Sequence, residues 1–265
     1  GSDAVRFALT TGTSAGNNVR ISEGRLESSR NFANKLWNAA RFVMSRMGPE
    51  NAATNWIDPE PIHLHDRWIV SRLQQTAENT NRLISDHQFG DAQREIHDFF
   101  WNEYCDWYIE LAKLRFDKPD QSSPLDILIH VLESSLRLLH PFMPFVTEEI
   151  WQILVSKVPS GYNLPNSIML ASYPDKTENK SDLESETAVN KIFELIGAVR
   201  NMRGELRIPA NELLEGDIFS AYDSNLIDDH SNAIQKLGGM KVTISTSELP
   251  PPTAGIVSLV TSGVS

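Results

Sequence analysis

The sequence has 265 residues, 40% of them apolar and 22% charged, a composition typical of globular proteins. No apolar run approaches about 18 residues, which excludes a transmembrane helix, and the charged Asp3 and Arg6 are unlike a signal peptide. The single cysteine, Cys105, excludes a disulfide framework and a thiolate zinc site. We therefore expect a cytoplasmic protein of one or two domains.

The net charge of −11 argues against nucleic acid as a partner, because a polyanion is drawn to positive surface. The charge is unevenly distributed, however. Residues 1–47 contain seven basic and three acidic side chains, a net charge of +4, so the remaining residues carry −15. The first fifth of the chain is basic within an acidic protein.

Residues 3–20 are mixed in character and predict an irregular tail. Five helices then follow from apolar residues at helical spacing, over 26–47, 63–87, 90–114 and 123–140, and from 144 onward. Gly48-Pro49 ends the first, Ser123 and Pro124 begin the fourth, and His140-Pro141 ends it. The third is rich in aromatic residues, which predicts a central position in the core. Successive helices with short connections predict an antiparallel bundle.

The C-terminal third changes character. Residues 156–180 contain four prolines or glycines and little periodicity, which predicts a linker, and Ser181 begins a long helix that ends at Ile208-Pro209. Strands are predicted over 213–219, 241–245 and 255–261, with a short helix over 225–237. The predicted fold is mainly α, an antiparallel helical bundle followed by a small α/β unit. The chain stops in strand-like sequence, so we expect a piece of a longer protein.

The basic helix over 26–47 separates into two faces when its residues are placed at about 100° intervals. One face is apolar and predicts core contact: Leu26, Phe32, Ala33, Leu36, Trp37, Ala40, Val43 and Met44. The opposite face is polar and contains no acid: Arg30, Asn31, Asn34, Lys35, Asn38, Arg41 and Arg46. Phe42 interrupts this polar face, two turns after Lys35.

An exposed aromatic ring beside lysine and asparagine has the chemistry needed to hold an unpaired base. The ring stacks on the base, the amides bond its edge and the cation meets a phosphate. The alternative is that Phe42 packs under a neighbouring segment such as residues 49–62, and the helical periodicity leaves both interpretations open.

Other candidate sites are weaker. His63 and His65 lack a nearby third ligand, so no metal site is expected. The sequence has no phosphate-binding glycine loop and no nucleophile–base pattern, so no catalytic residue is assigned.

Several sequence blocks resemble the valyl-tRNA synthetases, over nearly the whole chain. They are Ser2–Phe7, Arg30–Val43 (RNFANKLWNAARFV), Cys105–Lys113 and Arg200–Pro209. His140–Trp151 (HPFMPFVTEEIW) resembles a signature shared by the class I synthetases for Val, Ile, Leu and Met.

The resemblance implies an anticodon-binding region of a valine–tRNA ligase. Such a region has no catalytic site of its own. Its boundaries would be 1–24 for a connection from a catalytic domain, 25–158 for the helical bundle, 159–180 for a linker and 181–265 for the long helix and α/β unit. The HIGH and KMSKS motifs are absent from this sequence. The catalytic domain of such enzymes uses ATP and magnesium, so no cofactor is expected in this chain.

The partner that the resemblance implies is the anticodon stem-loop of tRNA(Val). The protein is expected to be a monomer and to bind no membrane. Positions matching the family's base-reading residues are Lys35 and Phe42, and Arg25 is the nearest match to a preceding arginine. Asn34, Asn38 and Arg41 would line the same surface. Arg200, Arg203 and Arg207 are expected mainly on a solvated helix face. An isoleucyl relative and a helical protein-interaction scaffold remain alternatives.

Overall fold

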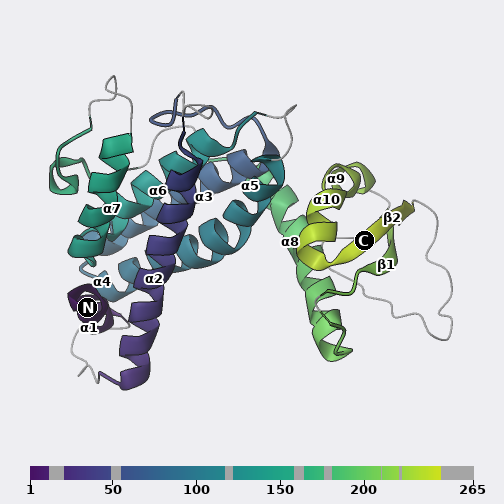
Figure 1. Ribbon diagram of the computed structural model, residues 1–265, viewed down its shortest axis with the longest axis horizontal. Helices are drawn as coiled ribbons and strands as arrows, with labels where there is room; N and C mark the ends of the chain where they lie inside the picture. Colours follow the sequence, from purple (N-terminus) through teal and green to yellow (C-terminus); the bar gives the residue numbers. More distant parts are fainter. Residues whose placement is uncertain are drawn as a thin grey trace. The chain divides into compact units, whose positions relative to one another are not determined.

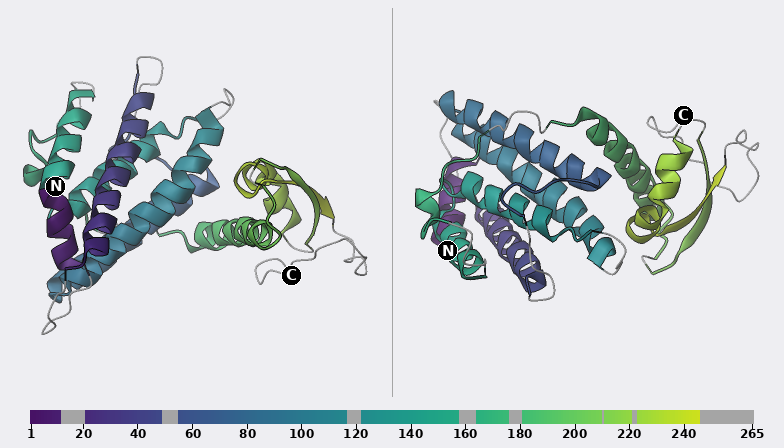
Figure 2. Two further views of the ribbon diagram at one scale, coloured as in Figure 1. Left: turned by 60° about the horizontal axis from the view of Figure 1, so that its bottom comes forward. Right: turned by 90° about the horizontal axis from the view of Figure 1, so that it is seen from above.

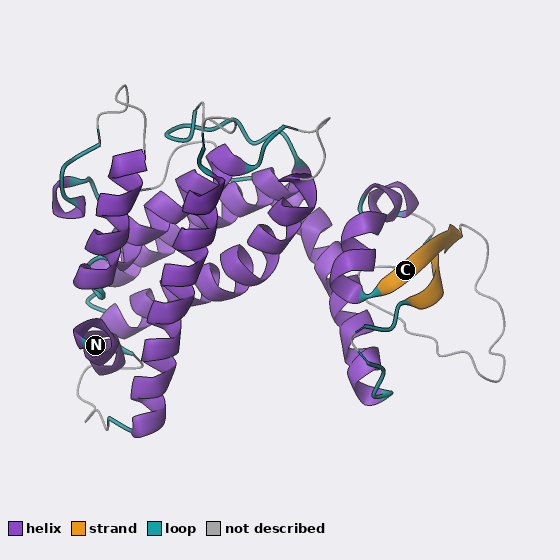
Figure 3. Ribbon diagram, viewed as in Figure 1, coloured by secondary structure: helices purple, strands orange, loops and turns teal. Residues whose placement is uncertain are grey.

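The computed structural model describes residues 1–11, 21–48, 55–116, 122–157, 164–175, 181–209, 211–220 and 223–245. Its contacts divide the chain into two compact units, Gly1–Asp182 and Leu183–Ser265. The first unit is built from helices, and the second combines helices with a small sheet (Figures 1 and 3). The predicted fold class, mainly α with a small α/β unit after the helices, is confirmed.

The first unit is a set of packed helices (Figure 2), and their buried apolar side chains form a shared core. Its elements are α1 (Ser2–Thr10), α2 (Glu23–Arg46), α3 (Leu64–Ser85), α4 (Phe89–Asp98), η1 (Phe99–Tyr108), α5 (Ile109–Phe116), α6 (Leu125–Leu139), α7 (Pro144–Lys157) and η2 (Ile168–Leu170). The five helices predicted from residue 26 onward all form, and their ends lie within three residues of the predicted positions. Apolar periodicity and proline stops were sufficient to place them.

The N-terminal residues correct one expectation. The irregular tail predicted over 3–20 instead begins with α1, which packs against α2, α4 and α7. Asp3 is buried, and its carboxylate accepts hydrogen bonds from the backbone N–H groups of Phe145 (3.4 Å) and Val146 (2.6 Å) at the start of α7. A buried acid does not resemble a core residue in sequence, so the pattern concealed this helix. Residues 12–20 lie outside the described part of the chain.

The third predicted helix is continuous from α4 to α5 but changes geometry at its centre. Residues Phe99–Tyr108 form a π-helix, in which the hydrogen bonds join residues five apart. Four of its aromatic side chains are buried in the core: Phe99, Phe100, Tyr104 and Tyr108. Trp101 and Trp107 are only half-buried, so the core interpretation holds for part of this segment.

The second unit contains α8 (Leu183–Glu205), β1 (Leu214–Phe219), α9 (Ser224–Asp229), α10 (Ser231–Ala233), η3 (Ile234–Gly238) and β2 (Met240–Ser245). The two strands pair in parallel, from Leu214 opposite Met240 to Phe219 opposite Ser245, with the short helices connecting them. The predicted strands at 213–219 and 241–245 are confirmed. The strand predicted over 255–261 lies outside the described residues, and the domain boundaries at 24, 158 and 180 stay predictions.

Candidate nucleic-acid interface

The helix α2 presents the polar face that the sequence predicts. Ser22 caps its first turn by accepting a hydrogen bond from the backbone N–H of Arg25 (3.3 Å). The apolar face is anchored in the core by the fully buried Phe32, Leu36 and Val43. Trp37 is the exception on this face: it was expected in the core, but it is 38% exposed. It lies at the margin of the apolar arc, where a small angular error moves a side chain to the surface.

The outward residues of α2 form one continuous surface, which we call the α2 polar face: Asn34, Lys35, Asn38, Arg41, Phe42 and Arg46. Asn34, Asn38 and Arg41 are exposed and follow one another at helical spacing. Lys35 and Phe42 are partly covered, because each contacts the neighbouring helix formed by η1 and α5. Arg25 is half-buried in the first turn of α2, so it lies on the same helix but well before Lys35.

Lys35 is held by two residues of η1. Its ammonium donates a hydrogen bond to the carboxylate of Asp106 and lies 4.3 Å from the ring centroid of Trp101. The Trp101 ring is itself fixed by stacked contacts with Phe32 and His97, at centroid distances of 6.2 and 5.8 Å. The lysine therefore points in a defined direction, although 27% of its side chain remains exposed.

Phe42 contacts aromatic and cationic groups from two helices. Its ring meets Phe116 of α5 edge-on, with centroids 6.4 Å apart and planes at 75°. The Arg46 guanidinium carbon lies 5.3 Å from the Phe42 centroid, and the Lys113 ammonium lies 5.2 Å from it. These distances are typical of cation–π contacts. Phe42 packs on α5 and is half-buried. The alternative cover by residues 49–62 stays a prediction, because residues 49–54 lie outside the described part of the chain.

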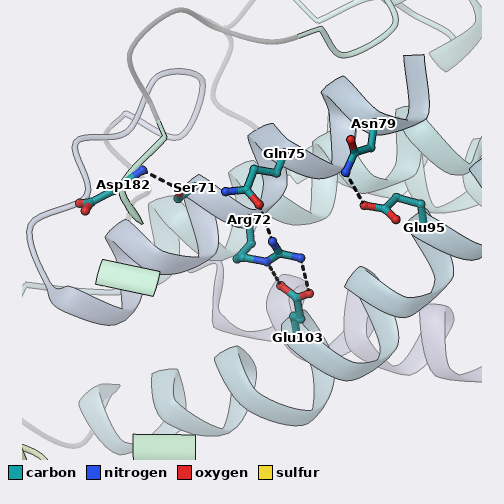
Figure 4. Close-up of polar contacts among 7 residues, drawn as sticks. All are labelled: Ser71, Arg72, Gln75, Asn79, Glu95, Glu103 and Asp182. Atoms are coloured by element: carbon teal, nitrogen blue, oxygen red, sulfur yellow. Dashed lines mark hydrogen bonds and ion pairs between the residues drawn. The ribbon is translucent and has the colours of Figure 1, made fainter. Parts of the chain in front are cut away.

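Half-buried polar contacts fix η1 and α4 against α3. The guanidinium of Arg72 in α3 donates to both carboxylate oxygens of Glu103 in η1, at 2.7 and 2.9 Å, and to Gln75 at 2.5 Å (Figure 4). Two turns after Arg72 along α3, Asn79 donates to Glu95 of α4 at 3.0 Å (Figure 4). This ladder sets the position of η1, and through it the position of Asp106 and Trp101.

A second, buried cluster fixes the end of α5. Asp66 of α3 accepts hydrogen bonds from Arg115 (2.6 Å) and from the hydroxyl of Tyr108 (2.7 Å). Burial, reinforced by the Asp66 charge, raises the pKa of Tyr108 well above its ordinary value, so this hydroxyl stays a donor. Because Arg115 neighbours Phe116, the cluster also holds the aromatic partner of Phe42 in place.

The structure thus brings together five of the six predicted site residues on one surface, with Arg25 towards the start of α2. The sequence reasoning missed four residues that complete this surface, Trp101, Asp106, Lys113 and Phe116, and it placed Arg46 on the polar face without assigning it to the site. All four belong to the aromatic-rich segment or to its continuation in α5, and the sequence assigned the aromatic residues of that segment to the core. An acid and a lysine among those aromatics, at Asp106 and Lys113, were the available signal.

Two other sets of candidate residues have structural roles. Arg203 was expected on a solvated face, but it is buried and donates to the carbonyl of Gly239 (2.8 Å), while Arg200 donates to that of Leu237 (2.8 Å). His63 contacts the hydroxyl of Ser122 (3.0 Å), and burial lowers its pKa. Among the described residues no group of three or more His, Cys, Asp or Glu side chains is arranged to hold a metal ion, and none of the helices is long and apolar enough to cross a membrane.

Comparison with known proteins decides the family. The family described as anticodon-binding domain of tRNA ligase matches residues 66–218, more than half of the chain. The chain belongs to this family. This anticodon-binding domain spans α3 to β1 in the structure and includes the η1 and α5 side of the candidate site, whereas α2 precedes the matched residues.

Among curated proteins, this anticodon-binding domain is similar to valine–tRNA ligases. The enzyme of Dehalococcoides mccartyi strain CBDB1 is 40% identical over 89% of this chain, and that of Symbiobacterium thermophilum is 39% identical over 85%. The enzyme of Aquifex aeolicus is 34% identical over 97% of this chain. The chain spans about a quarter of the length of these relatives. Among solved structures, a leucyl synthetase–tRNA complex of Agrobacterium radiobacter K84 aligns with a TM-score of 0.49 at 22% identity, covering 69% of this chain and 20% of that one.

Proposed function

We propose that this chain is the anticodon-binding region of a cytoplasmic valine–tRNA ligase and that it binds the anticodon stem-loop of tRNA(Val) as a monomer. The identity of 39–40% to several valine–tRNA ligases is the observation that carries the proposal. In the whole protein, activation of valine with ATP and magnesium would belong to the part of the relatives that this chain does not span.

The α2 polar face supports the proposal chemically. Phe42 offers an anchored ring for stacking on an unpaired base, and the exposed amides of Asn34 and Asn38 offer donors and acceptors for base edges. Arg41 and Arg46 offer charge for the phosphates that flank those bases, and Arg25 extends this charge towards the start of the helix. Lys35 would contact either a phosphate or a base edge.

Local charge also supports an RNA partner for an acidic protein. Between Asn31 and Gly48 the α2 segment contains no acidic residue, so a phosphate approaching from this side meets only neutral and basic side chains of that helix. Stacking and phosphate contacts together are the usual means by which proteins bind unpaired nucleotides.

Binding of RNA hairpins tests the proposal. Hairpins that carry a valine anticodon, an isoleucine anticodon and a scrambled loop would be titrated at two salt concentrations against the 265-residue chain and Phe42→Ala. We expect preference for the valine loop and a loss of about 1–3 kcal/mol in Phe42→Ala, the range measured when a stacking ring is removed.

A matched control is Phe89→Ala, which removes an exposed phenylalanine (46%) at the start of α4, on another helix. This variant should bind as the wild type does. Equal binding of all three hairpins, or an undiminished affinity of Phe42→Ala, would contradict the proposal, and binding that ignores salt would contradict the phosphate contacts.

A further inference from the structure

The contacts of Lys35 distinguish it from the other cations of the α2 polar face. Its ammonium is in hydrogen-bond contact with the carboxylate of Asp106 and lies over the face of Trp101, and both partners come from η1. Arg41, by comparison, is exposed, and Arg46 lies over two phenylalanine rings with no carboxylate among its described contacts. Lys35 is therefore the cation of this face whose charge is already balanced.

The π-helix explains how two residues of one element meet one ammonium. Trp101 and Asp106 are five positions apart. In an α-helix, side chains at this separation would point about 140° apart around the helix axis. In a π-helix the hydrogen bonds join residues five apart, so side chains at this spacing lie one above the other. The unusual geometry of η1 thus brings the indole and the carboxylate to the same lysine.

This arrangement disfavours a phosphate as the ligand of Lys35. A phosphate that reached the ammonium would also approach the Asp106 carboxylate, which is 48% exposed, and the two negative charges would repel each other. A base edge carries no net charge. An ammonium has three N–H donors, of which Asp106 engages one, so donors remain for a ring nitrogen or carbonyl oxygen of a base.

We infer that Asp106 and Trp101 are specificity-determining positioning residues, which balance the charge of Lys35 and aim its ammonium at an acceptor on a base edge. The inference rests on the proposed function, and what it adds is the role of Asp106 and Trp101, since the resemblance already implies that the residue at the Lys35 position reads a base. Arg41 and Arg46 then provide the phosphate contacts, and Lys35 distinguishes one base from another.

Salt dependence separates the two roles. The slope of log K against log salt changes by about 0.7 for each phosphate contact made by a single strand. We would measure it for the wild type, Lys35→Gln, Asp106→Asn and Asp106→Glu, with the valine hairpin and hairpins altered at the second or third anticodon base. Lys35→Gln should keep the wild-type slope and lose about fivefold or more of the discrimination at one base, the lower end of what a good base contact provides.

Asp106→Asn should free the lysine for phosphate. We expect tighter binding of every hairpin, a slope steeper by about 0.7 and weaker discrimination, whereas Asp106→Glu should restore most of the wild-type behaviour. An ion pair this exposed contributes little to stability, so the variants should fold, as circular dichroism would verify. Asp91→Asn is the matched control: it removes the same charge from the start of α4, fifteen residues away along the helix, and should leave slope and discrimination unchanged.

The outcomes are distinct. A slope lowered by about 0.7 in Lys35→Gln, with equal losses for all hairpins, would make Lys35 a phosphate ligand and overturn the inference. An Asp106→Asn variant that binds more tightly but discriminates as the wild type does would also overturn it. Absence of discrimination in the wild type itself would contradict the proposed function instead.

Discussion

Cys105 immediately precedes Asp106 and is the only cysteine of the chain. Desolvation raises the pKa of its thiol to about 12, although the nearby Lys35 charge acts in the opposite direction. The reactive form is the thiolate, and at pH 8 this pKa leaves roughly one thiol in ten thousand ionised. The folded protein should therefore be nearly inert to iodoacetamide.

We expect alkylation of Cys105 to follow unfolding. Mass spectrometry should find slow modification at pH 8 in buffer and rapid modification in urea, with the rate rising through the unfolding transition. Fast modification of the folded protein would show that the η1 segment opens locally, which would weaken its proposed role in holding Lys35.

At the scale of single residues, the sequence predicted one of the two partners in each contact of the site. A helical wheel orders the residues of a single helix, so it isolated Lys35 and Phe42 on the polar face of α2. It carries no information on which helix lies alongside. Asp106 and Phe116, each more than seventy positions away from its partner, became identifiable as site residues only from tertiary contacts.

Among the elements, α1 depends on one buried acid. Asp3 accepts the backbone N–H groups at the start of α7, so it caps that helix from outside it. Asp3→Ala should lower the free energy of unfolding by about 1–2 kcal/mol, since two partly buried N–H donors lose their acceptor. Asp3→Asn, which keeps one acceptor oxygen, should lose less.

Urea unfolding monitored by tryptophan fluorescence would measure both variants. An unchanged midpoint in Asp3→Ala would mean that water satisfies the α7 donors as well as Asp3 does.

Apolar periodicity predicted the long helices because each buries a wide stripe, but α1 has only nine residues and its decisive contact is polar. The same limit applies to η1, because a 3.6-residue period does not describe its geometry.

For the whole molecule, the six tryptophans offer a selective probe. All of them lie before Asp182, at positions 37, 56, 68, 101, 107 and 151, so their fluorescence reports on the first unit alone, whereas far-UV circular dichroism reports on both. Arg203 is buried in the second unit, where it donates to two backbone carbonyls, those of Pro209 and Gly239. Arg203→Ala should destabilise that unit by about 2 kcal/mol.

We expect Arg203→Ala to shift part of the circular dichroism transition to lower urea and to leave the fluorescence transition unchanged. Asp66→Ala, which breaks a buried ion pair of the first unit, should lower the fluorescence midpoint instead. A fluorescence shift in Arg203→Ala would show that the two units unfold as one. At the scale of the whole molecule the net charge of −11 was misleading, because this average does not show that one face of α2 has no acidic residue.

The π-helix of η1 also makes the site sensitive to chain length. A deletion of one residue within Phe99–Tyr108, for example the exposed Asn102, would remove one position from a segment whose hydrogen bonds join residues five apart, so the helix that follows would lose its register. Everything after the deletion would then rotate by about 100°. Phe116 would turn away from Phe42 and Arg115 from Asp66, so a single-residue deletion would dismantle the surface while leaving the identity of every contact residue intact.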